Sequence, residues 1–99
     1  MANRPKQVKI LGKPYTLTWQ TPPRDNGEPD YWGRVYPDTA HIYIEPKMPP
    51  AQRLDTLLHE TLHAISNQLS LDLDEKLVHR LAAGLTAVIL DNPRLFTPL

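Results

Sequence analysis

Apolar and polar residues alternate through most of the first half of the chain, and this pattern predicts β-strands. Residues 7–20 have apolar side chains at every second position on both sides of a turn at residues 12–14, which predicts a hairpin. Residues 31–36 are predicted to form a third strand. A fourth is predicted to begin at Ala40 and to end at Glu45.

The second half of the chain changes to helical periodicity. One helix is predicted from about Pro50 to about Leu69, because prolines stand where a helix can begin and apolar residues follow three or four positions apart. A second helix is predicted to start near Asp72, which has the spacing of a capping box with Glu75. The apolar stripe of the first helix consists of Leu54, Leu58, Leu62, Ile65 and Leu69.

These elements predict one α+β domain that covers residues 1–99. A small antiparallel sheet of three or four strands is expected to pack on two antiparallel helices, because the apolar helix faces need the sheet as a partner.

The amino-acid composition argues against some classes of binding partner. The formal net charge is zero and no block of Lys or Arg occurs, which argues against nucleic acid and against a membrane surface as partners. The absence of cysteine excludes disulfides and thiolate metal sites. The N-terminus lacks the apolar run of a signal peptide, so a cytoplasmic location is expected. The pattern predicts no oligomeric state.

The candidate chemistry lies in the first predicted helix, where His59-Glu60-x-x-His63 occurs. Residues four apart share a helix face, so both imidazoles can bind one metal ion. A catalytic zinc ion takes three protein ligands and leaves one position for water, from which Glu60 could accept a proton. Such a motif arises by chance in roughly one chain in a hundred of this length, and ordinary helix-surface residues are the alternative interpretation.

The third ligand is expected from the second helix, which must return alongside the first. Glu75 is the favoured candidate, with a simple capping role as its alternative. His79 lies one turn further along and could replace it, could support the ligands or could contact an oxyanion; a plain surface histidine is equally consistent. Asp72 and Asp74 are more simply explained as residues of the helix N-terminus.

Two further features could bind a substrate. Tyr31, Trp32 and Tyr36 form an aromatic group that either lines a pocket or covers the sheet. If residues 40–45 lie at a sheet edge, they could pair with an extended peptide or could be a plain edge strand without a ligand.

The segment from Thr56 to Ala64, Thr-Leu-Leu-His-Glu-Thr-Leu-His-Ala, followed by an acidic second helix, resembles the zincin metallopeptidases of the gluzincin type. Together with the small size and Arg-Leu-Ala-Ala-Gly-Leu at residues 80–85, it is similar to compact phage and prophage proteins of the ImmA/IrrE-like group. The resemblance covers residues 42–93 and lacks the metzincin extension after His63. It implies zinc bound by His59 and His63, Glu60 as general base, and hydrolysis of a peptide bond.

The sequence therefore supports two functional hypotheses. In the first, the chain is a zinc metallopeptidase that acts on a peptide or protein, in a phage-infected or lysogenic bacterial cell. In the second, it is a zinc-stabilised binding or regulatory module with little or no turnover, because a small domain has little material for a deep cleft. A metal-free structural protein is a weaker third interpretation.

Overall fold

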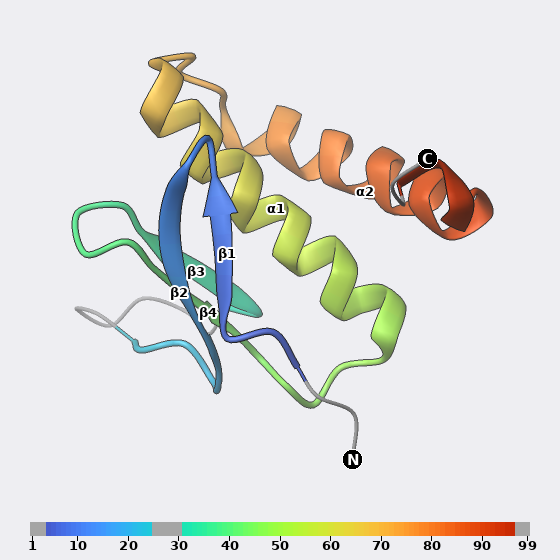
Figure 1. Cartoon of the computed structure of the whole chain (residues 1–99), viewed down its shortest axis with the longest axis horizontal. Helices are drawn as coiled ribbons and strands as arrows, with labels where there is room; N and C mark the ends of the chain where they lie inside the picture. The colour runs from blue at the N-terminus through green and yellow to red at the C-terminus, as the bar shows by residue number, and fades with distance from the viewer. Residues whose placement is uncertain (1–3, 25–30, 97–99) are drawn as a thin grey trace.

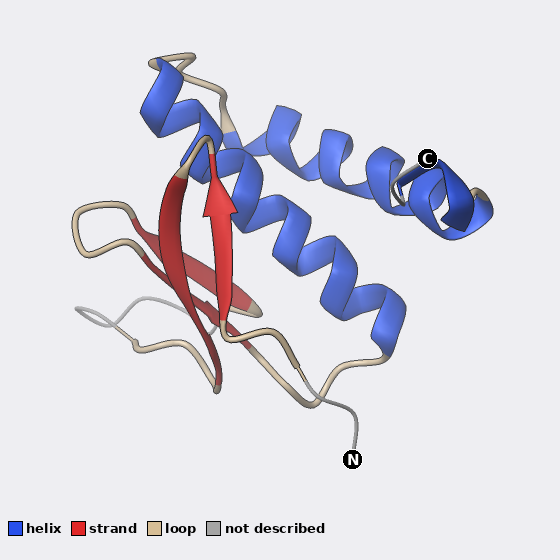
Figure 2. Cartoon of the chain, in the orientation of Figure 1, coloured by secondary structure: helices blue, strands red, loops and turns tan. Residues whose placement is uncertain are grey.

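The computed structural model describes residues 4–24 and 31–96, and it confirms the predicted α+β class. The four strands form one sheet, and helix α1 (Pro50–Leu69) lies across one of its faces (Figure 1, Figure 2). The second helix, α2 (Glu75–Asp91), runs back along α1 and, among the residues described, contacts no strand. The elements in chain order are β1 (Gln7–Ile10), β2 (Lys13–Trp19), β3 (Gly33–Tyr36), β4 (His41–Ile44), α1 (Pro50–Leu69), α2 (Glu75–Asp91) and the short 3-10 helix η1 (Pro93–Phe96).

The hairpin of β1 and β2 turns one residue earlier than expected. Leu11 and Gly12 both have positive φ, 53° and 81°, and Ile10 pairs with Lys13 across the turn. A two-residue turn of this kind matches the twist of the flanking strands, and glycine adopts positive φ without a steric cost. Lys13 and Pro14, predicted in the turn, belong to β2.

The strand order is β1-β2-β4-β3, and the sheet is mostly antiparallel. The β2–β4 pair is parallel, whereas β1–β2 and β3–β4 are antiparallel. Because β4 is hydrogen-bonded on both sides, residues 40–45 have no open edge. The predicted addition of a peptide to residues 40–45 required an edge position, and the structure contradicts that condition. On this side of the sheet the edge strand is β3.

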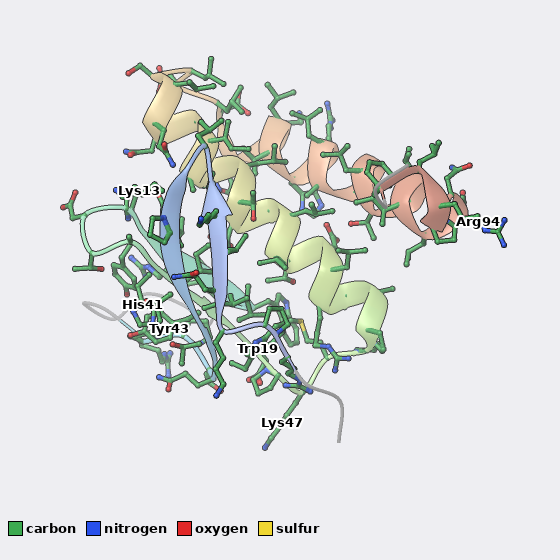
Figure 3. All side chains as sticks on the ribbon, viewed as in Figure 1. Lys13, Trp19, His41, Tyr43, Lys47 and Arg94 are labelled. Atoms are coloured by element: carbon green, nitrogen blue, oxygen red, sulfur yellow. The ribbon has the colours of Figure 1, made fainter. Side chains whose placement is uncertain are left out.

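The core lies between the sheet and α1. Ile42 and Ile44 of β4 are fully buried, as their predicted alternation requires, and they pack with side chains of β1, β2 and α1. His41 and Tyr43 lie on the opposite face, where their rings stack with centroids 4.4 Å apart (Figure 3). Thr18 is hydrogen-bonded to His41 at 2.7 Å. The most deeply buried apolar residues of this core are Ile10, Tyr15, Leu17, Ile42, Ile44, Met48 and Ala64.

Helix α1 has the predicted bounds, but its predicted apolar stripe is not its most buried side. The leucines of that stripe are half-buried or exposed, while the buried residues are Thr56, Glu60, Ala64 and Ser66. The reason is that α1 contacts both the sheet and α2, so no single face is the inner one. A charged residue, Glu60, thus lies on the side of α1 that is excluded from water.

Helix α2 begins later than the predicted capping box would place it. Asp74 is the N-cap, and its side chain accepts a hydrogen bond of 2.8 Å from the Leu77 N–H. Asp72 instead has a positive φ of 55° in the connection between the helices. The predicted pairing of Asp72 with Glu75 is therefore wrong, because three acidic residues lie within four positions and local spacing alone favours the wrong one. Glu75 becomes the first residue of α2, and its side chain is not used for capping.

Candidate metal centre

His59 and His63 lie one above the other on successive turns of α1. Their Nε2 atoms are 3.2 Å apart and their ring centroids 4.9 Å apart. The four-residue spacing places both rings on one side of the helix, as the sequence predicted. Both imidazoles are half-buried, and their Nε2 atoms face Glu75 at the start of α2.

Glu75 completes a cluster of three donors. Its Oε1 lies 2.5 Å from His59 Nε2, and its Oε2 lies 2.8 Å from His63 Nε2. The three residues offer ligand atoms that all lie within 4.8 Å of one another, so the group could hold a metal ion. The Glu75 side chain is 70% exposed, so core residues do not hold it in place. Its position follows from the place where α2 begins.

The donor set fits zinc. Tetrahedral coordination at zinc–ligand distances of about 2.1 Å separates two donor atoms by roughly 3.4 Å. The nitrogen and oxygen atoms here lie 2.5 to 3.2 Å apart, so small outward shifts of flexible side chains would accommodate an ion. Two imidazoles and one carboxylate are a common ligand set of catalytic zinc sites.

His79 is not part of this donor cluster. Its ring centroid lies 6.2 Å from that of His59, and the candidate metal group among the described residues is His59, His63 and Glu75. Of the two candidates for third ligand, the structure thus brings Glu75 to the histidines. His79 instead lines a neighbouring pocket of ≈ 220 Å³, together with Trp32.

Glu60 lies beside the cluster but faces the sheet. It is only 8% exposed, and its pKa is raised from 4.5 to about 8, mainly by burial and in addition by the negative charge of Glu75. Arg34 and a hydrogen bond with the Val35 backbone act in the opposite direction. A carboxyl group with a pKa near neutrality can both accept and release a proton at physiological pH.

Gly33 allows β3 to approach Glu60, although no motif in the sequence marks this glycine. A Cβ at this position would lie 2.6 Å from Thr56 Cγ2, 3.1 Å from Glu60 Cγ and 3.3 Å from Glu60 Oε2. Real Cβ atoms essentially never come within 3.0 Å of another atom, so any side chain at Gly33 would have to displace Thr56. The contact joins residues more than twenty positions apart, which local sequence patterns do not reveal.

Replacing Gly33 with alanine should therefore destabilise the protein. The added methyl group must push β3 away from α1, and overpacking of this kind costs about 1–3 kcal/mol. Urea unfolding measures the change. The same substitution at Gly84, where a Cβ meets no atom within 4 Å of the same chain, is the control; measured on dilute, monomeric protein it should not destabilise. Equal unfolding free energies for both variants would contradict the steric role of Gly33.

The raised pKa of Glu60 also predicts a pH dependence for the metal-free protein. Between pH 4.5 and about 8 the folded chain keeps a proton on Glu60 that the unfolded chain has lost. Folding then takes up a proton, so the free energy of unfolding should fall as pH rises through this window. The effect is about 1.4 kcal/mol per unit of pKa difference. Urea unfolding of chelator-treated protein at pH 5 and pH 8 measures it. The Glu60→Gln variant should lose much less stability than wild type; an equal loss would contradict the assignment.

A cleft of ≈ 540 Å³ connects these residues with the sheet. His59, Glu60, His63 and Glu75 line one side, and β3 lines the other. The predicted aromatic group is divided: Tyr31 and Trp32 lie at the pockets, but Tyr36 packs edge-on against Tyr43 at a centroid distance of 5.9 Å. The residues that line this cleft are Tyr31, Gly33, Arg34, Val35, Pro37, His59, Glu60, His63, Asn67 and Glu75.

Comparison of the chain with models of protein families, with curated proteins and with solved structures found no match. Among the residues described, no helix has the length and apolar character needed to cross a membrane. The function is therefore inferred from the donor cluster, the buried carboxyl group and the cleft that they line.

Proposed function

We propose that this chain is a zinc-dependent metallopeptidase of the gluzincin type, with His59, His63 and Glu75 as the zinc ligands. The observation that carries the proposal is the arrangement of two imidazoles and a carboxylate within 4.8 Å, beside a second carboxyl group that is buried and lines the same cleft. A simple surface ion pair would not need Glu60 to be withdrawn from water next to it.

The chain's own groups have distinct roles in this reaction. A bound zinc ion would lower the pKa of a water ligand and polarise the substrate carbonyl. Glu60 accepts the proton of the attacking water at its carboxylate and later gives that proton to the leaving amine nitrogen. Burial and the charge of Glu75 raise the pKa of Glu60 in the metal-free chain, and the positive charge of a bound zinc ion would lower it again, so that the carboxylate form can accept the proton.

The substrate is a peptide or protein that binds along β3. This strand is at the sheet edge and contributes Gly33, Arg34 and Val35 to the wall of the cleft opposite the donors. An extended peptide could pair with the open edge of β3 through backbone hydrogen bonds. Its scissile carbonyl would then lie near the zinc ligands. His79 and Trp32, which line the adjoining pocket, would meet the neighbouring part of the peptide, where His79 can donate to an oxyanion.

Zinc content and peptide cleavage test this proposal together. Protein purified without added metal should contain about one equivalent of zinc, and it should cleave members of a peptide library. Cleavage should stop with a chelator and return with zinc. Protein without zinc, or zinc-loaded protein that cleaves no peptide at any concentration tested, would contradict it.

A binding or regulatory module stabilised by zinc is the second candidate function. The observation that favours it is the exposure of Glu75, which places part of the donor cluster at the surface of a small domain. Its signature would be a protein that a chelator destabilises but that hydrolyses no peptide. The metal content measured in the same experiment separates both candidates from a metal-free structural protein.

A further inference from the structure

The outer surface of α2 is unusually apolar. No charged residue occurs from Leu81 to Leu90, although most of these residues are exposed. Leu81 is 41% exposed and Val88 44% exposed. A surface helix normally carries charged residues on the side that faces water, and a continuous apolar surface of this kind indicates a binding partner.

Four residues at regular helical spacing lie on the side of α2 that faces away from α1. Arg80, Gly84, Ala87 and Asp91 follow one another at spacings of four, three and four residues, so they form one seam along the helix. All four are exposed, whereas Val78 and other residues of the opposite side are buried. We call these four residues the α2 seam.

The two ends of the α2 seam have opposite charges. Arg80 and Asp91 lie about 16 Å apart along the helix axis. Within residues 4–24 and 31–96, neither has an ion pair or a side-chain hydrogen bond. Asp91 is also the last residue of α2, where the helix dipole disfavours a negative charge, and no basic residue lies in that turn. A cation from outside the chain would offset this unfavourable position.

Gly84 lies in the middle of the seam, and the fold of one chain does not require it. A Cβ on Gly84 would meet no atom within 4 Å. Glycine is among the poorest helix formers, so alanine would serve the isolated helix better. A glycine in this place is useful where a second backbone approaches closely, and Ala87 one turn further on leaves similar room.

We propose that the α2 seam binds the α2 seam of a second copy of this chain, with the two helices antiparallel. A twofold axis between Gly84 and Ala87 places Arg80 of each chain beside Asp91 of the other. The interface then contains two identical Arg80–Asp91 ion pairs. The same axis places Gly84 against Ala87 and Leu81 near Val88 across the interface. A symmetric pair satisfies both ends of the seam at once, which identifies a second copy as the occupant.

The donor cluster stays accessible in this dimer. Glu75 faces the histidines of α1, on a different side of α2 from the seam. The dimer is thus independent of the proposed peptidase function, and either can hold without the other.

Charge reversal at the two ends of the seam tests the dimer. Analytical ultracentrifugation should show a reversible dimer for the wild-type chain. Arg80→Glu alone and Asp91→Arg alone should each weaken it at least about tenfold, because each variant brings like charges together at two positions. Mixing the two variants should restore dimers between unlike chains, since every charged pair is then opposite again. Lys9→Glu, an exposed charge on β1, is the control and should leave the dimer unchanged.

A second variant tests close packing of the helices. Gly84→Leu should fold and bind zinc like wild type, because the space around Gly84 is open in one chain, yet it should sediment as a monomer. Three outcomes would overturn the proposal: a wild-type chain that stays monomeric up to about 1 mM, a dimer equally strong in the single charge variants, or a mixture that does not restore association.

Discussion

Replacing Glu60 with glutamine should abolish peptide cleavage and leave the zinc content at its wild-type level. Glutamine has nearly the same shape as glutamate but cannot accept and release the proton, and loss of a general base lowers the rate by about 10²- to 10⁴-fold. Zinc should remain because Glu60 is not one of the three donors. Steady-state cleavage of a peptide found in the library screen gives kcat and KM for both proteins. The loss should appear in kcat.

The control for this variant is the same chemical change outside the cleft. Glu45 is a half-buried residue directly after β4 whose carboxylate accepts hydrogen bonds from the Thr21 hydroxyl and the Lys47 N–H, and Glu45→Gln should cleave like wild type. If Glu60→Gln retained full cleavage, Glu60 would not be the proton acceptor. If it lost zinc as well as cleavage, Glu60 would have a structural role at the metal.

Replacing Glu75 with alanine should weaken zinc binding by at least about a hundredfold. Loss of an orienting group around a metal ligand already costs 10- to 100-fold in affinity, and a direct ligand is expected to cost more. At saturating zinc, a hundredfold loss of affinity removes up to about 2.7 kcal/mol of metal-dependent stability. Because the Glu75 side chain is 70% exposed, the metal-free variant should fold normally. A competition titration with a zinc-binding dye measures the affinity.

His79→Ala is the informative comparison for this prediction. His79 lines the neighbouring pocket and is absent from the donor cluster, so its loss should change zinc affinity little. A His79→Ala variant that lost zinc while Glu75→Ala kept it would reverse the assignment of the third ligand. Lys76→Ala, the next residue of α2, controls for general effects on the start of the helix.

The local parts of this fold could be predicted from the sequence. Helix α1 spans Pro50–Leu69 as predicted, because proline at its start and helical apolar spacing are both short-range signals. The spacing of His59 and His63 fixes their common side for the same reason. Glu75 could be named as the favoured third donor because a short connection returns α2 to α1, and the structure brings it to both histidines.

The parts that depend on long-range contacts could not be predicted. The parallel pairing of β2 with β4 places β4 inside the sheet, and the strand pattern itself contains no information on strand order. The contact of Gly33 with Thr56 and Glu60 depends on how closely β3 approaches α1. The choice of Asp74 over Asp72 as the N-cap depends on the path of a five-residue connection, where neighbouring acidic residues give the same local signal.

These corrections change the site more than the fold. The strand that can position a peptide is β3, because β4 is paired on both sides. Glu75 is free to bind a metal, because Asp74 caps α2 in its place. As a result, the proposed substrate strand β3 and the donor cluster line the same cleft. The sequence could indicate the donor residues but not the strand.

The most direct test of the metal centre is a crystal structure of the zinc-loaded protein, with anomalous diffraction recorded at the zinc absorption edge. The proposed site predicts one strong peak per chain, about 2.1 Å from the Nε2 atoms of His59 and His63 and from a carboxylate oxygen of Glu75. Glu60 should lie beside that peak without binding it directly. A peak coordinated by His79 in place of Glu75, or no peak between α1 and α2, would contradict the proposed centre.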